Sequence, residues 1–172
     1  GRGFDPHGHR DMEIITYVRR GAITHADNLG NQGRTEAGDV QVMSAGTGIL
    51  HAEYNKEDDP TTLFQIWIEP NQTGIEPRWD ARKFPKETRD GRLEILASGR
   101  PEDRDSDALT IHQDAAVLGA TLTAGEEIAH RLGAGRSAYI VPARGTLEIN
   151  GRPAPERSGT AVTDVDDITI RA

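Results

Sequence analysis

The chain has 172 residues, a formal net charge of −8, 28% charged and 35% hydrophobic residues, and it contains no cysteine. No apolar run approaches the roughly 20 residues that a membrane-spanning helix needs, and so acidic a chain lacks the positive surface that binds nucleic-acid backbones directly. The absence of cysteine excludes disulfide bonds, thiolate metal sites and cysteine nucleophiles.

The first part of the chain is predicted to form short β-strands joined by tight turns. Residues 9–20 are rich in β-branched and aromatic side chains in an alternating pattern, which predicts a single strand that ends at Gly21. Residues 45–48 form a tight loop that delivers His51. Residues 63–69 have a pronounced strand pattern, and we expect this strand to be buried on both faces. Further strands are expected at residues 22–26, 34–37 and 40–43.

A second set of strands follows an irregular stretch. Residues 70–90 contain three prolines and mixed charges without a regular period, so we expect a connector between two β-units. The pair Asn150-Gly151 lies between two strand-like runs, which is a strong signal for a β-hairpin. The later strands are predicted at residues 92–97, 115–123, 137–142, 146–149, 160–163 and 168–171. With helix nearly absent, the pattern favours an all-β duplicated barrel whose second copy has diverged.

Two short segments, His7-Gly8-His9 and His51-Ala52-Glu53, each place two potential metal ligands at positions i and i+2. Side chains two apart on a strand share a face, so each segment can present a pair of ligands to one point. Three imidazoles and one carboxylate suit a first-row transition metal. A single HxH pair is more often a surface feature or a core pair with local hydrogen bonds. Two such pairs joined by hairpin signals favour a metal site.

The remaining histidines and large aromatic residues are weaker candidates. His25 lies on the next predicted strand, where it either lines the cavity or has a surface or turn-capping role. His112 and His130 have no HxH or HxE partner, so we expect no second metal site in the later half. Trp67 and Phe64 belong to the strand predicted to be buried, which favours a core role over a substrate platform.

The stretches PHGHRDMEIITYVRRG and GDVQVMSAGTGILHAEYN resemble the metal-binding domain of the pirin family, within the cupin superfamily. His7, His9 and Glu13 match the first cupin motif, except that seven residues, and not six, separate Glu13 from Gly21. In the second motif Ser44 replaces a proline, and two extra residues precede His51. These departures are themselves pirin-like. The stretch LTAGEEIAHRLGAGRSAYIVPARGTLEINGRP resembles the second, metal-free cupin domain, so the similarity covers nearly the whole chain.

The resemblance implies two jelly-roll β-barrels of the cupin type. We expect an N-terminal metal-binding barrel over residues 1–75, a linker over 76–91 and a degenerate, metal-free barrel over 92–172. Both ends look clipped relative to the family, so the first barrel is expected to lack its first strands. No signal peptide is visible, which favours a cytoplasmic protein.

Carried over residue by residue, the resemblance makes His7, His9, His51 and Glu53 the metal ligands. The ion would be iron, with nickel, cobalt, copper, manganese or zinc as alternatives. Glu13 fills a slot that is a ligand in many other cupins. In the predicted strand it lies on the same face as His9. It therefore either accepts a hydrogen bond from a metal-binding imidazole or is a hydrogen-bonded polar residue at the barrel mouth.

Some pirin-like proteins act as quercetin 2,3-dioxygenases, so the resemblance implies an enzyme that opens a flavonol ring with O2. Glu53 would accept the flavonol proton as general base, and Met43 and Ile49 would form apolar walls of the cavity. Other pirin-like proteins are described as regulators. The alternative is therefore a non-enzymatic metal-binding protein that docks on a transcription factor or metabolic enzyme. A third alternative is a metal-free cupin. None of them requires direct binding to nucleic acid or a membrane.

Overall fold

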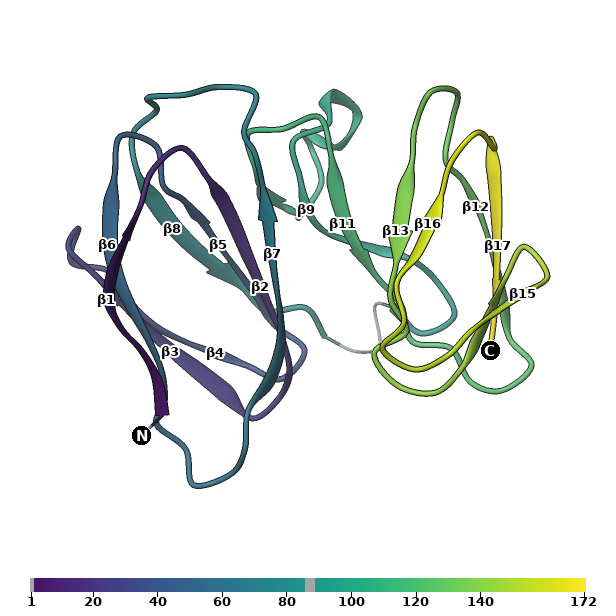
Figure 1. Ribbon diagram of the computed structural model, residues 1–172, viewed down its shortest axis with the longest axis horizontal. Coiled ribbons are helices and arrows are strands. Elements are labelled where there is room, and N and C mark those ends of the chain that lie inside the picture. The colour runs from purple at the N-terminus through teal and green to yellow at the C-terminus, as the bar shows by residue number, and fades with distance from the viewer. Residues whose placement is uncertain (1, 86–88) are drawn as a thin grey trace. The chain divides into compact units, whose positions relative to one another are not determined.

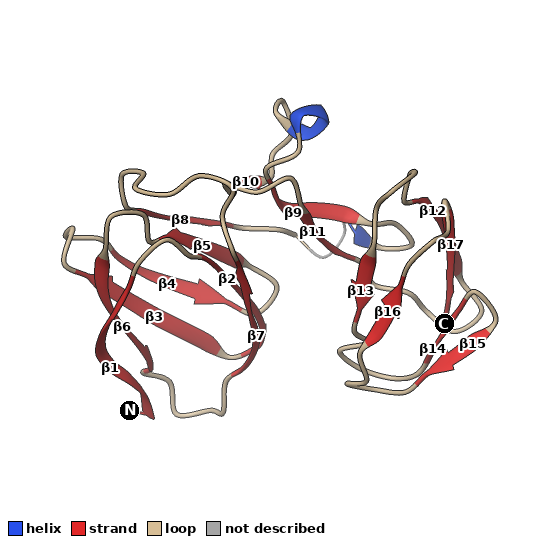
Figure 2. Cartoon of the chain, turned by 45° about the horizontal axis from the view of Figure 1, so that its top comes forward, coloured by secondary structure: helices blue, strands red, loops and turns tan. Residues whose placement is uncertain are grey.

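The computed structural model describes residues 2–85 and 89–172, and in these ranges the chain consists almost entirely of strands and loops (Figure 1). A short 3-10 helix, η2 (Pro101–Asp103), interrupts them (Figure 2). Within the same ranges no helix is long and apolar enough to cross a membrane. The prediction of an all-β fold is confirmed.

The chain divides into two compact units. The first unit comprises Gly1–Lys86 and Ile95–Gly119, and the second comprises Glu87–Glu94 and Ala120–Ala172. The segment Ile95–Gly119, which the sequence assigns to the second barrel, therefore packs with the first unit. The expected domain borders near residues 75 and 92 stay a prediction.

The first unit contains two four-stranded antiparallel sheets that form two layers (Figure 2). The β1 sheet has the order β1 (Arg2–His9), β6 (Ile49–Asn55), β3 (Ala22–Asp27) and β4 (Gln32–Glu36). The β2 sheet has the order β7 (Thr62–Ile68), β2 (Glu13–Arg20), β5 (Val40–Ser44) and β8 (Arg78–Arg82). Side chains meet between the layers, because Glu53 on β6 accepts hydrogen bonds from Gln41 on β5 and Gln65 on β7.

The single strand predicted over residues 9–20 is wrong. Strand β1 ends at His9 and β2 begins at Glu13 in the other sheet. Between them Asp11 has a φ of 45°, in the left-handed region, and its backbone N–H donates to the carbonyl of Gly46 at 2.9 Å. This corner depends on a partner distant in sequence, so side-chain alternation along the segment could not reveal it.

Strand β8 lies inside the stretch expected to be an irregular connector. It pairs antiparallel with β5, where Trp79 lies opposite Met43 and Ala81 opposite Gln41. The local sequence RWDAR has little strand character of its own. The segment is a strand because it pairs with the edge of β5, and its own composition does not specify this conformation.

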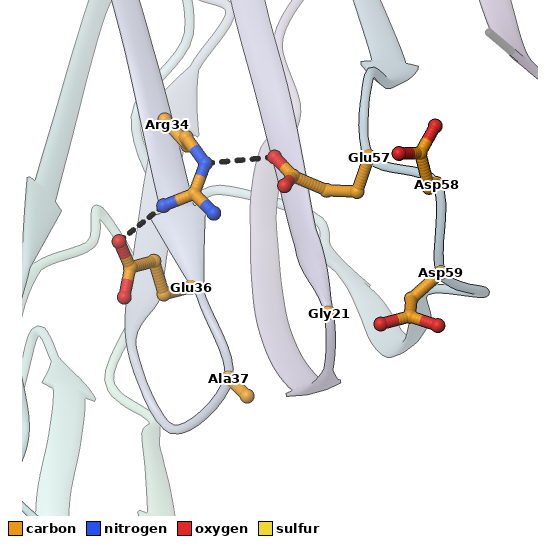
Figure 3. A pocket seen from close by; sticks show the side chains of 7 residues that line it. All are labelled: Gly21, Arg34, Glu36, Ala37, Glu57, Asp58 and Asp59. Atoms are coloured by element: carbon orange, nitrogen blue, oxygen red, sulfur yellow. Dashed lines mark hydrogen bonds and ion pairs between the residues drawn. The ribbon is translucent and has the colours of Figure 1, made fainter.

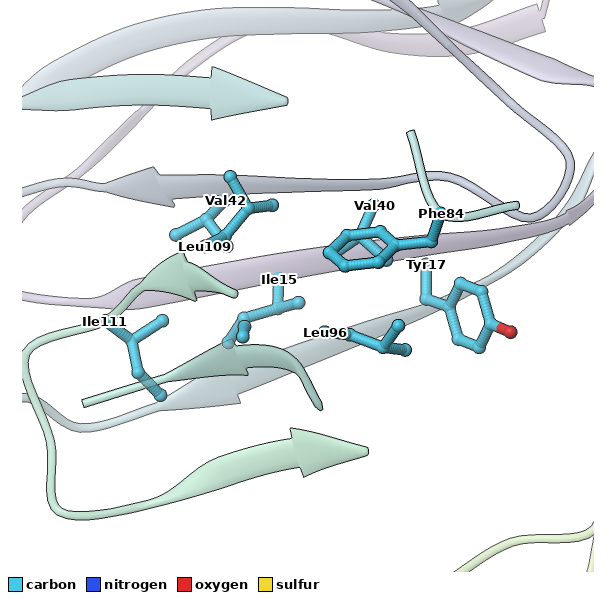
Figure 4. Packing of buried hydrophobic residues seen from close by; sticks show 9 residues of the cluster. Ile15, Tyr17, Val40, Val42, Phe84, Leu96, Leu109 and Ile111 are labelled. Carbon is cyan, nitrogen blue, oxygen red and sulfur yellow. The ribbon is translucent and has the colours of Figure 1, made fainter. Parts of the chain in front are cut away.

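The face of the β2 sheet that points away from the β1 sheet is covered by three further strands. They are β10 (Leu109–Thr110), β9 (Glu94–Ser98) and β11 (Ala116–Gly119), in that order across their sheet. The buried cluster between them (Figure 4) comprises Ile15, Tyr17, Val40, Val42, Phe84, Leu96, Ala97, Leu109 and Ile111. Burial of these apolar side chains explains why this segment belongs to the first unit.

The second unit has its own small core. One sheet has the order β12 (Glu127–Arg131), β17 (Asp167–Arg171), β14 (Leu147–Ile149) and β15 (Arg152–Ala154), and β13 (Ala138–Ile140) pairs with β16 (Thr160–Val162). The predicted hairpin is confirmed between β14 and β15, where Asn150 and Gly151 have φ values of 47° and 75°. The buried cluster comprises Ile149, Ala154, Val162, Ile168 and Ile170.

Candidate metal centre

The pairing of β1 with β6 places the two predicted ligand segments side by side. His7 lies directly opposite His51 in the antiparallel register. The ring centroids are 4.4 Å apart for His7 and His51, 4.8 Å for His7 and His9, and 5.0 Å for His9 and His51. One nitrogen of each ring lies within 4.8 Å of a nitrogen of the other two. The structure thus brings together the three imidazoles that the sequence singles out.

Glu53 follows His51 by two residues on β6, and two amides hold its carboxylate. Gln41 Nε2 donates to Oε1 at 2.5 Å, and Gln65 Nε2 donates to Oε2 at 2.9 Å. Both oxygens keep free lone pairs, because a carboxylate offers about four acceptor positions. A carboxylate oriented in this way is suited to ligate a metal ion, since metal-binding carboxylates are themselves usually hydrogen-bonded.

The side chain of His25 on β3 also lies in the interior, close to His51 and Glu53. It lies opposite Glu53 in the β3–β6 register and is fully buried. Its Nε2 is 2.9 Å from Asp27 Oδ2, and its ring stacks on Trp79 with a centroid distance of 4.9 Å and an interplanar angle of 10°. One ring nitrogen of His25 lies within 4.8 Å of donor atoms of both His51 and Glu53. Of the two expected placements, His25 adopts the interior one.

The electrostatics of the cluster favour neutral imidazoles. Burial lowers the pKa of His51 to about 3, and the neighbouring His7 adds to the shift. Burial also lowers the pKa of His9, again with His7 as a further cause. Both rings are therefore neutral at pH 7, which is the form that ligates metals. Burial raises the pKa of the Glu53 carboxyl, against the opposing effects of His25 and the two glutamine amides.

The cluster also contains polar atoms that no protein group satisfies. Both ring nitrogens of His51 and Nδ1 of His25 are buried without a hydrogen-bond partner among the described residues. Leaving such atoms unpaired costs about 1–3 kcal/mol each. At His7 the backbone carbonyl of Asp5 lies 2.7 Å from Nδ1 and can only accept, so Nδ1 carries the proton and Nε2 keeps its lone pair. These residues fit a divalent transition-metal ion.

Glu13 has a different environment from the one suggested by strand parity. It is fully buried and accepts a hydrogen bond from Ser44 Oγ at 2.9 Å, and its Oε1 lies 3.3 Å from Nδ1 of His112. It therefore contacts Ser44 and His112 and holds none of the clustered imidazoles. Parity with His9 fails as an argument because the strand is broken at residues 10–12.

The apolar surroundings of the centre also differ from expectation. Met43 is buried in a packed cluster with Ile14, Ala45 and Ile49, so it belongs to the core. Ile49 is buried in the same cluster but also lines a pocket beside His9, so its role as a cavity wall stays a prediction. Trp67, expected in the core, is 53% exposed and meets the ring of His9 edge-on at 5.0 Å. The strand β7 is thus not buried on both faces. Phe64 does pack against the core cluster that contains Ile15.

Sequence reasoning missed four side chains that support the centre. Gln41 and Gln65 interrupt apolar runs on β5 and β7, and a polar residue in such a run is a usable signal. The HxD spacing of His25 and Asp27 is a similar signal, because a carboxylate often orients a histidine ring. No local pattern indicates the stacking of Trp79, which requires the pairing of β8.

A pocket elsewhere in the first unit is acidic and shares no residue with the centre (Figure 3). Its lining residues are Gly21, Arg34, Glu36, Ala37, Glu57, Asp58 and Asp59. Arg34 Nε donates to Glu57 Oε1 at 2.8 Å, and the same guanidinium pairs with Glu36. The hydrogen bond from Arg34 lowers the pKa of the Glu57 carboxyl.

Replacing Arg34 with alanine should therefore raise the pKa of Glu57 toward its ordinary value. The physical reason is loss of both the hydrogen bond and the positive charge beside the carboxylate. The measurement is a carbon-detected NMR titration of the Glu57 carboxyl in both proteins. An unchanged Glu57 titration would show that this pair does not form in solution.

Two family models match this chain. The model of the pirin family, described as Pirin, matches residues 1–68, and the quercetinase C-terminal cupin domain matches residues 95–172. A pirin-like protein of Caulobacter vibrioides is 59% identical over 170 residues, which is 99% of this chain and 72% of that protein.

Other relatives cover the chain in full. The quercetin 2,3-dioxygenase of Escherichia coli K12 is 40% identical over 173 residues, covering 100% of this chain and 72% of that protein. The crystal structure of the bacterial pirin YhhW from Escherichia coli in complex with nickel(II) superposes with a TM-score of 0.89 at 40% identity. It covers 100% of this chain and 72% of its own. The strands, the paired ligand segments and these relatives agree, and the chain belongs to the pirin family of cupin proteins.

Proposed function

We propose that this protein is a metal-dependent dioxygenase that opens a flavonol ring of the quercetin type with O2. The ligands would be His7, His9, His51 and Glu53. The observation that carries the proposal is His51, a buried imidazole at the centre of a histidine cluster, both of whose nitrogens have no hydrogen-bond partner in the described part of the chain. The proposal is supported by the Escherichia coli relative named quercetin 2,3-dioxygenase and by the nickel complex of a bacterial pirin.

The donor set decides the class of ion. Neutral imidazoles and a carboxylate suit iron, nickel, cobalt, copper, manganese and zinc, and we propose iron as the native ion. When bound, the ion would act as a Lewis acid toward the flavonol oxygen. His7, His9, His51 and Glu53 would hold this ion. The imidazoles of His9 and His51 would enter this set without releasing protons, because burial lowers the pKa of both rings and keeps them neutral.

Glu53 is the proposed general base. Burial raises the pKa of its carboxyl, which brings the group closer to the range in which it can accept and return a proton near neutral pH. A flavonol hydroxyl proton would move to a carboxylate oxygen of Glu53. The amides of Gln41 and Gln65 hold the two oxygens in place for this transfer.

Two exposed aromatic rings adjoin the imidazoles. Trp67 meets His9 edge-on at 5.0 Å, and Phe4 meets His7 edge-on at 6.2 Å. Exposed aromatic side chains provide faces on which a flat aromatic ring can stack. We propose that they contact the flavonol together with Ile49, which lines a pocket beside His9, in place of the buried Met43.

The function is tested by adding quercetin to protein loaded with iron, nickel, cobalt, copper or manganese, one ion at a time. Loss of the flavonol absorbance band in air, and its persistence without oxygen, is the expected result. Protein freed of metal by chelation should leave the band unchanged. Absence of turnover with all five ions would contradict the dioxygenase and favour the metal-binding regulator.

Replacing Gln65 with leucine removes the N–H that orients Glu53 but keeps a side chain of similar size. We expect metal affinity to fall about 10–100-fold, because partners that orient a ligand contribute this much to affinity. Isothermal titration with nickel measures the change. The control is Gln72→Leu at an exposed position. Equal affinities in the two variants would contradict the orienting role of Gln65.

A further inference from the structure

The potential ligands of the interior form two groups that share His51. The outer group is His7, His9 and His51, and the inner group is His25, His51 and Glu53. In the inner group the three donor atoms lie within 4.8 Å of one another, and all three residues are buried. The sequence comparison with cupins assigns no metal-binding role to His25.

His25 has the features of a metal-binding histidine. Its Nε2 is 2.9 Å from Asp27 Oδ2, so Nε2 carries the proton and Nδ1 keeps its lone pair. Nδ1 is buried and has no hydrogen-bond partner among the described residues. Histidines that bind metals nearly always donate their second N–H to a carboxylate or a carbonyl, which is the arrangement seen here.

The carboxylate behind His25 is itself fixed. Asp27 Oδ1 accepts from the backbone N–H groups of Leu29 at 2.9 Å and Asn31 at 3.0 Å, and Oδ2 accepts from Asn31 Nδ2 at 2.9 Å. On the other side the His25 ring is stacked on Trp79. The imidazole is therefore held in one orientation before any ion binds, which lowers the entropic cost of ligation.

We propose that His25, His51 and Glu53 form a second, inner position for a divalent transition-metal ion. Two histidines and one carboxylate with open positions are the set typical of non-haem Fe(II) centres. The proposal rests on the metal-binding part of the proposed function and is independent of flavonol turnover. Because a neutral imidazole offers one lone pair, His51 serves one position at a time. The protein therefore binds one ion, which has two alternative places.

The test removes the two histidines that belong to the outer group alone and keeps the shared His51. The double variant His7→Ala/His9→Ala retains the inner donors and should still bind one Co²⁺ per chain, measured by calorimetric titration and by the visible absorption of the cobalt complex. Adding His25→Gln should weaken Co²⁺ binding at least tenfold relative to the double variant. The glutamine amide can still donate to Asp27, so this change removes the ligand and preserves the hydrogen bond.

The control adds His130→Gln, on β12 of the second unit, to the same double variant and should leave Co²⁺ binding unchanged. Circular dichroism checks that each variant is folded. Loss of all Co²⁺ binding in the folded double variant overturns the inner position, and so does equal binding with and without His25→Gln. Retained Co²⁺ binding in the double variant, together with absent quercetin turnover in the wild type, would overturn the dioxygenase alone.

Discussion

Replacing His51 with alanine should abolish stoichiometric metal binding, and with it any quercetin turnover. His51 is the one residue common to both donor groups, so its loss breaks the outer and the inner position together. We expect affinity to fall by more than about 100-fold, beyond the loss caused by removing a supporting partner. Elemental analysis of the protein after loading and gel filtration measures the effect.

The same variant should remain folded without metal. Alanine removes packing at β6, but it also removes two buried nitrogens that have no hydrogen-bond partner within residues 2–85 and 89–172, so the two effects on stability oppose each other. A cooperative thermal transition by circular dichroism checks this. The matched control is His130→Ala in the second unit, which should bind metal as the wild type does. Full metal content in His51→Ala would contradict the ligand assignment.

Replacing Ile15 with alanine should destabilise the first unit strongly. Ile15 is fully buried at the middle of the cluster between the β2 sheet and the segment Ile95–Gly119 (Figure 4). Deleting three buried carbon atoms from such a position costs about 2–5 kcal/mol in the free energy of unfolding. Urea denaturation followed by tryptophan fluorescence measures it, since Trp67 and Trp79 both lie in the first unit.

Leu29→Ala is the control for this prediction, because Leu29 is an exposed apolar residue at a turn. Its effect should stay within about 0.5 kcal/mol, as is usual for surface positions. A cost below about 1 kcal/mol for Ile15→Ala would mean that the segment Ile95–Gly119 does not cover this face in solution.

The sequence predicts the elements whose signals are local. Strands β3 and β5 lie where alternation and turn residues place them, and the hairpin at Asn150-Gly151 follows from turn chemistry alone. The break at Asp11 and the strand β8 were not predictable in this way. Both depend on hydrogen bonds to segments far along the chain, which no window of neighbouring residues contains.

The candidate site likewise contains features that local sequence predicts and features that depend on contacts between distant segments. The two ligand pairs are visible because i, i+2 spacing is a property of one strand. The contacts of Gln41 and Gln65 with Glu53 are not visible, because they join two sheets. His25 is an intermediate case, since its pairing with Asp27 is local but its approach to His51 follows from the β3–β6 register.

The metal content of the wild-type chain tests the central claim most directly. Protein purified without chelators, loaded in turn with each first-row divalent ion and freed of excess by gel filtration, is analysed for bound metal. We predict one transition-metal ion per chain, because His51 can serve only one position at a time. Protein that remains metal-free after loading with every one of these ions would contradict the proposed centre and the function built on it.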